Sequence, residues 1–472
     1  MARIAVIGGG VAGLACAWRL QRAGHEVVVL EREAVPGGRM RSERVETSRG
    51  VFVVDRGAQF VASGYRNLLQ VAATLGIAAK LHPLGKTSNA ILRDGRLHPG
   101  DYGSPIEFAR SRLISTRSKL RLPRLLLEIA RHRKRLDPYR PARTAPIDRE
   151  SLADGLTRVA GEEAMEYLLS PAFSSTFDAD PEDHSLAFAL LTLRFVLGGF
   201  ELLAFEGGSG LLTQTLAAQL PVRTGCEVTA VETDAHGARV ALRVDGRDET
   251  LAFDAAVVAL PGSLVDRVVA TLTPDEKSFF ASVRYVRGMV CFLLTERAPA
   301  TLPWYGVAFP RREDVGLYGL AVDHWKPGVA PAGAGLLNAA LTAQAAERLR
   351  DAPDAAVVAH VLDALAKTPV GRLDPIASAV HRWDPMLPLF PAGHLARLAA
   401  FEARRDRSPR LAFAGDYLVG PYTEMALTSG MRAATEIAGA ARSGLGRGRS
   451  FEGPLEAAGS RRQGGTRYAA PS

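Results

Sequence analysis

A glycine-rich stretch close to the N-terminus carries the clearest chemical signal in the sequence. An apolar run at residues 3–7 (RIAVI) is followed by Gly8, Gly10 and Gly13 in the spacing G-x-G-x-x-G. Glycines at this spacing allow a tight turn, a close approach of the backbone to a pyrophosphate and close packing of a helix on the strand. Glu31 stands 18 positions after Gly13, where a carboxylate can accept hydrogen bonds from ribose hydroxyls. The spacing therefore predicts a site for a dinucleotide.

Three elements must position these groups. The sequence predicts a buried strand over residues 3–7, an apolar-periodic helix that ends near Ala23, and a second strand over Glu26–Leu30. The N-terminus of the helix then faces the phosphates, because its first backbone N–H groups have no partner within the helix. Strand, glycines, helix, strand and acid occur in this order within about 30 residues, which favours a bound cofactor over a plain glycine turn.

A glycine pair and an arginine follow Glu31. The stretch from Glu31 to Arg39 reads E-x(5)-G-G-R, in which Gly37 and Gly38 let the chain pass close to a cofactor and Arg39 can neutralise pyrophosphate charge. This stretch resembles the extended signature of the flavin amine oxidase superfamily, which includes monoamine oxidases, protoporphyrinogen oxidases and phytoene desaturases. The resemblance implies FAD as the cofactor. Pro385 stands where some monoamine oxidases carry the cysteine that links the flavin, so we expect non-covalent FAD.

The resemblance extends along the chain to about residue 441 and implies further cofactor contacts. By this resemblance, residues 55–60 (DRGAQF) run past the isoalloxazine ring, and Val228 offers its backbone to the adenine. An apolar strand ends at Gly415-Asp416 in a second flavin signature, and the helix after it points its positive end at the flavin. The implied cofactor-binding residues are Gly8, Gly10, Gly13, Glu31, Arg32, Gly38, Arg39, Gly57, Ala58, Gln59, Val228, Gly415, Asp416, Thr423 and Met425.

The candidate substrate pocket lies in the C-terminal third of the sequence. By the resemblance, Met386 and Tyr422 stand at the two aromatic-cage positions of monoamine oxidases, so only half of the cage is aromatic. Trp383 and Phe390 belong to a W-x4-P-x-[YF]-x2-G-H spacing that protoporphyrinogen oxidases share. Trp383, Met386 and Tyr422 also have a plain packing interpretation. Many amine oxidases place a lysine near the flavin, but none stands near Met289, and we assign no catalytic side chain because the flavin carries the chemistry.

The resemblance implies an FAD-dependent oxidoreductase of the amine oxidase superfamily, closest in organisation to protoporphyrinogen oxidases. Such an enzyme transfers a hydride from a hydrophobic small molecule, with amines among the candidates, to flavin N5, and O2 or another acceptor then takes the electrons. The half cage weakens the amine interpretation. Three alternatives stay open, namely oxidation of protoporphyrinogen or coproporphyrinogen, desaturation or dehydroxylation of an isoprenoid, and flavin binding without turnover.

These motifs predict an α/β fold with two domains. One is a discontinuous, Rossmann-like FAD-binding domain of the amine oxidase or glutathione-reductase type, and the other is a substrate domain with a mixed sheet and helices. A Gly/Ser/Arg-rich tail is predicted to be disordered. The predicted ranges are 1–68, 204–284 and 400–441 for the FAD-binding domain, 69–203 and 285–399 for the substrate domain, and 442–472 for the tail.

The positive charge of the chain is concentrated in two segments. The net charge is +8, of which residues 110–143 carry +10 and residues 442–472 carry +4, so the remainder carries −6. Residues 110–143 mix Leu and Ile with Arg and Lys at helical spacing, and Pro123 interrupts the pattern. This pattern is typical either of a solvated helix that packs its apolar face inward or of a basic surface that lies on anionic lipid. Without a recognition motif, it does not indicate nucleic-acid binding.

The composition excludes several other classes of protein. The 472 residues are 47% hydrophobic and 23% charged, as in a soluble globular protein. Cys16, Cys226 and Cys291 show no ligand-pair or disulfide spacing, which favours a reducing, cytoplasmic compartment. His184 in an acidic stretch is too little to predict a metal site. No apolar run reaches the roughly 18 residues of a membrane span, and the N-terminal glycines do not fit a signal peptide.

Overall fold

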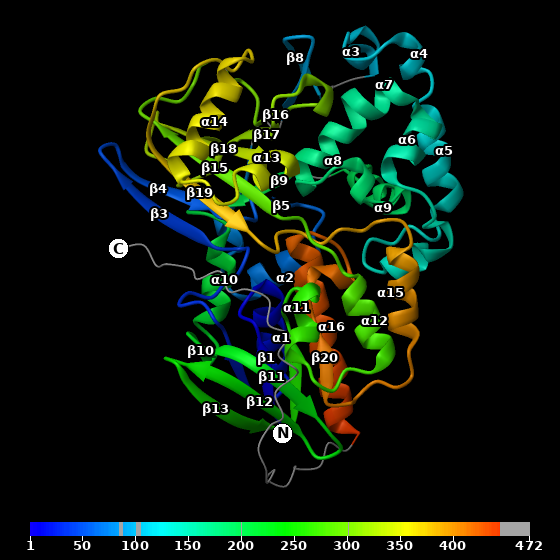
Figure 1. Cartoon of the computed structure of the whole chain (residues 1–472), viewed down its shortest axis with the longest axis vertical. Coiled ribbons are helices and arrows are strands. Elements are labelled where there is room, and N and C mark those ends of the chain that lie inside the picture. Colours follow the sequence, from blue (N-terminus) through cyan, green and yellow to red (C-terminus); the bar gives the residue numbers. More distant parts are fainter. Residues whose placement is uncertain (85–87, 101–104, 200, 301, 444–472) are drawn as a thin grey trace.

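A parallel sheet of five strands lies in the lower half of the molecule in Figure 1. This computed structural model describes residues 1–84, 88–100, 105–199, 201–300 and 302–443. The strand order is β10-β2-β1-β14-β20. The bounds are β1 Arg3–Ile7, β2 Glu26–Leu30, β10 Val222–Arg223, β14 Ala255–Val258 and β20 Leu411–Phe413. The strands predicted at 3–7 and 26–30 are confirmed, and parallel pairing brings the carboxyl ends of β1, β14 and β20 to one edge, where open α/β sheets bind ligands.

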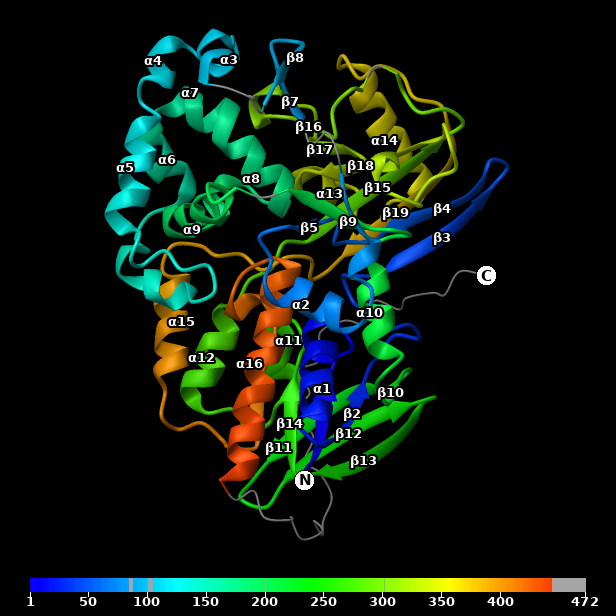
Figure 2. The ribbon, with the colours of Figure 1, turned by 180° about the vertical axis from the view of Figure 1, so that it is seen from behind.

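Two helices, α1 (Val11–Arg22) and α16 (Thr423–Arg442), lie side by side on one face of this sheet (Figure 2). Their close approach depends on glycine, because a Cβ on Gly430 would lie 2.0 Å from the carbonyl oxygen of Ala12. The helix predicted to end near Ala23 is confirmed. Since α16 follows soon after β20, this packing holds the N-terminal and C-terminal motifs at the same end of the sheet.

A second sheet and three helices cover the opposite face. Alternate residues of β1 point to the two sides, so that Ile4 and Val6 pack with α1 and α16, while Ala5 and Ile7 join the other core. The covering strands are β11 Glu227–Thr233, β12 Ala238–Val244 and β13 Arg247–Phe253, and the helices are α11 Gly262–Val268, α12 Pro274–Ser282 and α15 His394–Ala403.

A mixed sheet of seven strands forms the upper part of the molecule, in the order β19-β15-β18-β17-β16-β7-β8. Every residue of its strand β15 is buried. The bounds are β7 Asn89–Arg93, β8 Arg96–Pro99, β15 Gly288–Thr295, β16 Gly306–Ala308, β17 Leu317–Val322, β18 Gly335–Leu341 and β19 Pro375–Trp383. Helices α13 (Ala343–Arg348) and α14 (Asp354–Ala366) pack on one face. Strands β7 and β8 form a hairpin with an Asp-Gly turn, with Asp94 at φ 51° and Gly95 at φ 72°.

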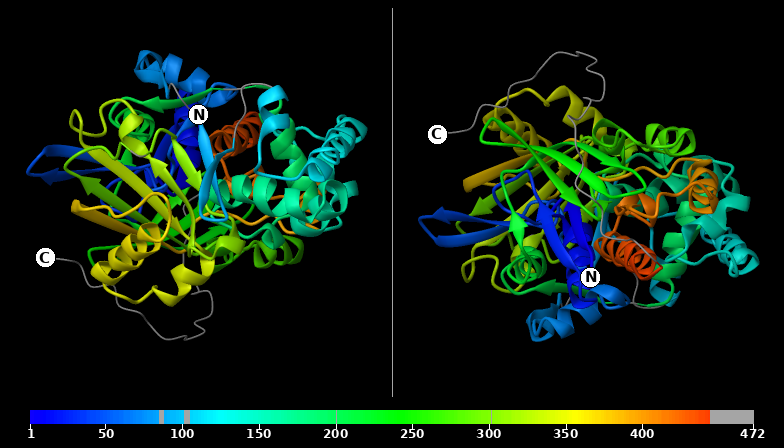
Figure 3. Two further views of the ribbon diagram at one scale, coloured as in Figure 1. Left: turned by 90° about the horizontal axis from the view of Figure 1, so that it is seen from above. Right: turned by 90° about the horizontal axis from the view of Figure 1, so that it is seen from below.

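A layer of helices stands beside this sheet, and the view from above in Figure 3 shows its cyan members at the outer edge of the molecule. The bounds are α3 Pro105–Arg110, α4 Thr116–Lys119, α5 Pro123–His132, α6 Leu152–Ala160, α7 Glu162–Ala164, α8 Ser170–Phe177 and α9 Leu186–Val196. The predicted interruption at Pro123 is confirmed, because this residue begins α5. A π turn, η3 (Met165–Leu169), joins α7 to α8.

Short elements connect these layers. The helices are α2 Asn67–Thr74 and α10 Gly210–Ala217, and the strands are β3 Ser42–Thr47, β4 Gly50–Asp55, β5 Val61–Ala62, β6 Leu81–Pro83 and β9 Leu202–Phe205. The 3₁₀ turns are η1 Ala78–Lys80, η2 Pro141–Ile147, η4 Pro181–Asp183, η5 Arg311–Glu313, η6 Asp323–Trp325 and η7 Asp416–Leu418. The β3–β4 hairpin projects from the body of the molecule (Figure 1).

The domain boundaries stay a prediction, although the two main sheets draw on different parts of the chain. Of the predicted tail, Arg442 ends α16, and residues 444–472 lie outside the described part of the chain. Among the described residues, no helix combines the length and the apolar character that a membrane span requires.

Candidate cofactor and active site

The glycine turn after β1 has the geometry that the sequence predicts. Gly8 adopts φ 104°, a conformation that L side chains rarely reach. A Cβ on Gly13 would lie 1.9 Å from the carbonyl oxygen of Gly8, so only glycine allows α1 to approach β1 this closely. A Cβ on Gly10 would meet nothing within 4 Å. The backbone of Gly10 therefore faces open space at the N-terminus of α1, which fits a bound pyrophosphate.

Glu31 lies beside this turn at the end of β2. Its carboxylate accepts hydrogen bonds from the backbone N–H of Gly9, at 2.6 Å, and of Glu33, at 2.8 Å. The backbone N–H of Cys226 donates to the carbonyl oxygen of Glu31 at 2.8 Å, which brings the start of β11, with Val228, to the same edge. Arg32 points outward, pairs with Glu33 and is 67% exposed in its side chain.

Arg39 joins the two ends of the predicted site. Its guanidinium pairs with the Asp416 carboxylate at 2.7 Å and donates a hydrogen bond to the carbonyl oxygen of Met386. Asp416 also accepts from the Tyr285 hydroxyl, at 3.2 Å, and that hydroxyl accepts from the backbone N–H of Gly262. Burial opposes the charge on Arg39, but Asp416 raises the pKa of the guanidinium above its ordinary value. The arginine therefore stays charged where an anionic cofactor would bind.

The loop at residues 55–59 lies directly behind Arg39. The backbone N–H of Ala58 donates to the Arg39 carbonyl oxygen at 2.9 Å, and a Cβ on Gly57 would lie 2.4 Å from that oxygen. The Gln59 amide group donates to the carbonyl oxygens of Asp55 and Gly57, both at 3.0 Å. These bonds close the loop on itself and fix its distance from the arginine.

The N-terminus of α16 completes the site. The Ser429 hydroxyl accepts a hydrogen bond from the backbone N–H of Gly415 at 2.8 Å, so the helix is tied to the end of β20. Thr423 is the first residue of α16, and Met425 is buried at 2% exposure. The positive end of a 20-residue helix thus stands next to Asp416 and Gly415.

The structure separates the four pocket candidates. Trp383 and Tyr422 are partly exposed, and their polar atoms already have hydrogen-bond partners. The Trp383 indole N–H donates to the Arg56 carbonyl oxygen at 2.9 Å, and the hydroxyl groups of Tyr422 and Thr192 are hydrogen-bonded at 2.9 Å. Met386 is buried against Gly288, where a Cβ would lie 1.9 Å from its sulfur. Phe390 has no exposed surface and lies in the core.

An aromatic cluster connects Phe390 to Tyr422, another of the pocket candidates. The ring of Phe390 stacks on Phe188 at 4.9 Å, Phe188 contacts Phe177 edge-on at 5.3 Å, and Phe177 contacts Tyr422 edge-on at 5.5 Å. Phe390 thus supports the tyrosine from within the core, whereas the rings of Tyr422 and Trp383 can contribute to a pocket wall.

Three residues at this site were not predicted from the sequence. Tyr285 holds Asp416, and Glu424 accepts hydrogen bonds from the backbone N–H groups of Arg66, Asn67 and Leu68, which ties α16 to α2. Glu424 stands in the C-terminal motif, but its neighbours in space could not be read from it. The third residue is Lys326, which contacts Gln59 and has no motif around it.

The described residues fit a bound dinucleotide. Open space above Gly10, a carboxylate at the end of β2, a charged arginine and two helix N-termini converge at the carboxyl edge of one parallel sheet. Pro385 replaces the linking cysteine of some monoamine oxidases, and the described cysteines, Cys16, Cys226 and Cys291, are buried. The site therefore suits a cofactor that is held without a covalent bond.

Comparisons with known proteins agree with this site. A family model described as flavin-containing amine oxidoreductase matches residues 11–438. Mitochondrial protoporphyrinogen oxidase of Nicotiana tabacum is 32% identical over 187 residues, which cover 39% of this chain and 34% of that protein. Carotenoid phi-ring synthase of Streptomyces griseus is 29% identical over 469 residues, covering 92% and 87% of the two chains.

A solved structure shows the same fold. Cyclohexylamine oxidase from Brevibacterium oxydans superposes with a TM-score of 0.69 at 19% identity, covering 93% of this chain and 99% of that chain. The match to the tobacco enzyme spans only about a third of its length. The predicted fold class is confirmed by the family model and by this superposition. The chain belongs to the flavin-containing amine oxidoreductase family, and it is an oxidoreductase that depends on non-covalently bound FAD.

Proposed function

We propose that this enzyme oxidises a hydrophobic small molecule at a C–H bond, with an amine as the first substrate class to test. The observation that carries the proposal is the double contact of Arg39, which pairs with Asp416 of the cofactor site and bonds the Met386 carbonyl oxygen. Residues 383–386, which hold two pocket candidates, are thereby attached to the cofactor site.

The pocket candidates favour an apolar substrate. Because the polar atoms of Trp383 and Tyr422 are bonded to Arg56 and Thr192, these side chains offer only their ring faces to a substrate. FAD, when bound, supplies the hydride acceptor, and O2 or another acceptor then takes up the electrons. The chain's own part is to bind the substrate, orient its C–H bond and exclude water.

Two alternative substrate classes are kept as outcomes of the test. The similarity to a protoporphyrinogen oxidase supports a porphyrinogen, including coproporphyrinogen, and the similarity to a carotenoid ring synthase supports an isoprenoid. These names describe the activities of the relatives themselves. The substrate class of this enzyme therefore has to be assigned by direct reduction of its flavin.

The test is anaerobic reduction of the purified holoenzyme. An amine, a porphyrinogen and a polyene are each mixed with the enzyme, and loss of the flavin absorbance band is followed. We expect the amine to reduce the flavin, and Tyr422→Ala to slow this reduction at least tenfold, on the order expected for a lost orienting contact. Tyr422→Phe keeps the ring and serves as the matched control. Reduction by only the porphyrinogen or only the polyene reassigns the substrate, and reduction by none overturns the proposal.

We also propose that the surface formed by α3, α4 and α5 rests on an anionic membrane. Four large apolar side chains stand exposed there, with Ile106 at 63%, Leu120 at 76%, Leu126 at 54% and Leu127 at 68%. Residues 110–143, which include α4 and α5 and continue beyond them, carry a net charge of +10. Exposed leucines among arginines are the composition of a surface that lies on lipid.

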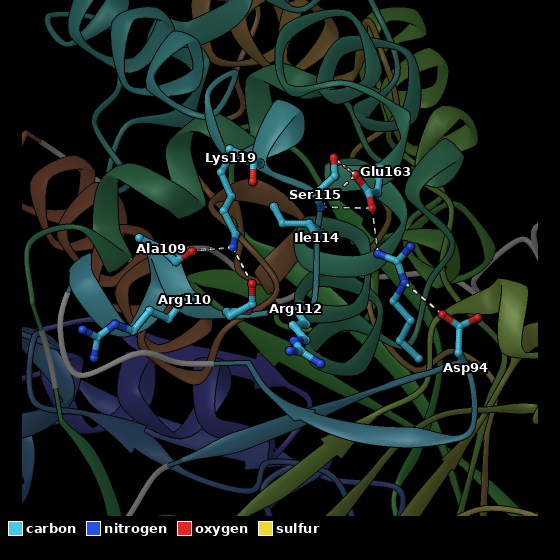
Figure 4. A pocket seen from close by; sticks show the side chains of 11 residues that line it. Asp94, Ala109, Arg110, Arg112, Ile114, Ser115, Lys119 and Glu163 are labelled. Carbon is cyan, nitrogen blue, oxygen red and sulfur yellow. Dashed lines mark hydrogen bonds and ion pairs between the residues drawn. The ribbon is translucent and has the colours of Figure 1, made fainter.

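A pocket opens on this surface (Figure 4), with a volume of about 510 Å³. Within it, Lys119 donates to the carbonyl oxygens of Ala109 and Ser111, and Glu163 is bonded by the Arg93 guanidinium at 2.8 Å. Arg110 and Arg112 point away from these pairs. Their charges are available to the phosphate of a lipid headgroup.

Vesicle flotation tests the membrane proposal. We expect the protein to float with vesicles that contain about one third anionic lipid at low salt, and to be released by salt because the attraction is screened. Leu126→Asp with Leu127→Asp should abolish flotation. Ile376→Asp, at a side chain that is 38% exposed on β19, is the control and should float like the wild type. Equal recovery with neutral and anionic vesicles would contradict the proposal.

A further inference from the structure

Lys326 is a buried lysine that lies outside every motif of the sequence. It follows η6 at the end of the strand β17, and its side chain is 1% exposed. The ammonium group donates to the Gln59 side-chain oxygen at 2.6 Å, and it pairs with Asp323 at 2.9 Å and with Asp55 at 3.5 Å. The contacts with Gln59 and Asp55 are hydrogen bonds and the contact with Asp323 is an ion pair, so three polar side chains surround the ammonium group.

The charge of this lysine is maintained by its neighbours. Burial acts to lower the pKa of Lys326, but the attraction of Asp323 and the other anionic neighbours outweighs it and raises the pKa above its ordinary value. Both carboxylates are almost fully buried, at 2% and 1% side-chain exposure for Asp55 and Asp323. One lysine therefore faces two buried carboxylates, of which burial raises the pKa of Asp323, and the formal charge of the three side chains is −1.

Asp55 and Gln59 are the two ends of the loop that lies behind Arg39. Asp55 is fixed on its other side by the Ser42 hydroxyl, at 2.6 Å, and by the backbone N–H of Ser209, at 2.8 Å. The Gln59 amide group donates its hydrogen bonds to two carbonyl oxygens of the loop itself. The hydrogen bond from Lys326 to the Gln59 side-chain oxygen then connects this residue to the rest of the protein. Lys326 thus clamps both ends of the loop.

The loop connects Lys326 to the cofactor site through Arg39. Ala58 donates to the Arg39 carbonyl oxygen at 2.9 Å, and Arg39 pairs with Asp416 at 2.7 Å. Lys326 follows β17 of the seven-stranded sheet through the turn η6, whereas Arg39 and Asp416 stand at the edge of the five-stranded sheet. The chain of contacts therefore runs from one sheet to the cofactor edge of the other.

We propose that Lys326 is a positioning residue for FAD, which sets the loop at residues 55–59, and through it Arg39, at the distance that the cofactor requires. The lysine acts through Gln59 and Asp55 and does not itself touch the substrate. This inference rests on the FAD site and not on the substrate class, so its test needs no turnover. It applies whichever substrate the enzyme proves to use.

The decisive variant preserves the formal charge of the group. Lys326→Met combined with Asp323→Asn leaves Asp55 as the single carboxylate, so the formal charge stays at −1 while the contact with Gln59 is lost. We expect this double variant to fold like the wild type and to release FAD roughly tenfold faster or more, the scale at which supporting hydrogen-bond partners act on a bound centre. Gln59→Leu keeps the lysine and its ion pairs, and it should release FAD faster as well.

A buried ion pair outside the loop provides the control. Arg404 pairs with Glu276 at 2.9 Å, and the two side chains are 6% and 5% exposed. Arg404→Met should lower the melting temperature and leave the release of FAD within about twofold of the wild type, because removal of a buried pair acts on the fold as a whole.

Each measurement uses the purified holoenzyme. The release rate is followed by the recovery of flavin fluorescence on dilution, and the visible absorption spectrum of the bound flavin reports on its surroundings. The expected result is faster release and an altered spectrum in the double variant and in Gln59→Leu, but not in Arg404→Met. A double variant that folds and keeps both the wild-type release rate and the wild-type spectrum would overturn the proposal, even if Lys326→Met alone fails to fold.

Discussion

Arg39 is the side chain on which the two ends of the cofactor site converge. It bridges Asp416, from the C-terminal motif, and the Met386 carbonyl oxygen, from the candidate pocket. A guanidinium can make both contacts because its donors are arranged in a rigid, planar fork. The residue is therefore a structural junction as well as a candidate ligand for the pyrophosphate.

Replacement of Arg39 should destabilise the folded protein. Arg39→Met leaves Asp416 without its cation at 6% side-chain exposure, so we expect the free energy of unfolding to fall by about 2 kcal/mol. Arg32→Met is the matched control, and because its exposed pair with Glu33 contributes little, the change should stay within about 0.5 kcal/mol. Urea unfolding measures both changes. Equal losses of unfolding free energy in the two variants would contradict the structural role assigned to Arg39.

Asp178 carries a second prediction at this scale. It follows α8, one of its carboxylate oxygens is buried without a partner among the described residues, and burial raises its pKa to about 7. Because the pKa of this carboxyl is higher in the folded chain than in the unfolded chain, the folded protein becomes less stable as the pH rises from about 4 to about 7. Asp178→Asn should thus stabilise the protein by about 2 kcal/mol at pH 8 and change little at pH 4. Thermal unfolding across this range checks it, and a gain that is equal at both pH values would contradict it.

At the scale of elements, the contact between α1 and α16 determines how the two cofactor motifs meet. Gly430 permits the contact, since any side chain there would collide with the Ala12 carbonyl oxygen. The helix cannot move away without displacing its own N-terminus, which is tied to β20 through Ser429 and to α2 through Glu424.

Two glycines of α16 separate packing from helix propensity. Gly430→Ala forces α16 away from α1, and we expect a loss of about 2 to 3 kcal/mol in the free energy of unfolding. Gly439 lies on the same helix, and a Cβ there would meet nothing within 4 Å. Gly439→Ala should therefore stabilise the protein by about 0.5 kcal/mol through helix propensity. Urea unfolding measures both, and a neutral Gly430→Ala would show that the contact is not restrictive.

At the scale of the whole molecule, buried histidines make the stability of the folded protein decrease in acid. Burial lowers the pKa of His184 to about 3 and those of His381 and His394 to about 4. The unfolded chain binds protons at these histidines near pH 6.5, whereas the folded chain does not. The stability that they contribute is therefore present above about pH 6.5 and is lost as the pH falls towards about 4.

This response can be measured on one variant and one control. We expect the free energy of unfolding to fall between pH 6.5 and pH 5, and His394→Leu to reduce that slope by about 1 kcal/mol per pH unit. His236 is exposed, so His236→Leu should leave the slope unchanged. Urea unfolding at several pH values gives the slopes, and identical slopes in the wild type and His394→Leu would refute the assignment.

The sequence by itself determined the local elements and predicted a dinucleotide site, and the resemblance to the flavin amine oxidase superfamily implied that the dinucleotide is FAD. Glycine spacing, an apolar strand before it and an acid after it depend on neighbours within one βαβ unit, so Gly8, Gly10, Gly13 and the bounds of β1 and β2 could be predicted closely. The hairpin at Asp94-Gly95 and the start of α5 at Pro123 follow from backbone restrictions that are equally local.

Only the tertiary structure decided which distant groups meet. The pairing of Arg39 with Asp416 joins residues that are hundreds of positions apart, and Phe390 proved to lie in the core although its motif also suited a pocket wall. The clamp of Lys326 on the loop at residues 55–59 depends on how two sheets pack. Which residues are buried and which residues contact each other both depend on this packing. A single sequence determines the periodicity of each element, but it does not determine which face of an element packs against which neighbour.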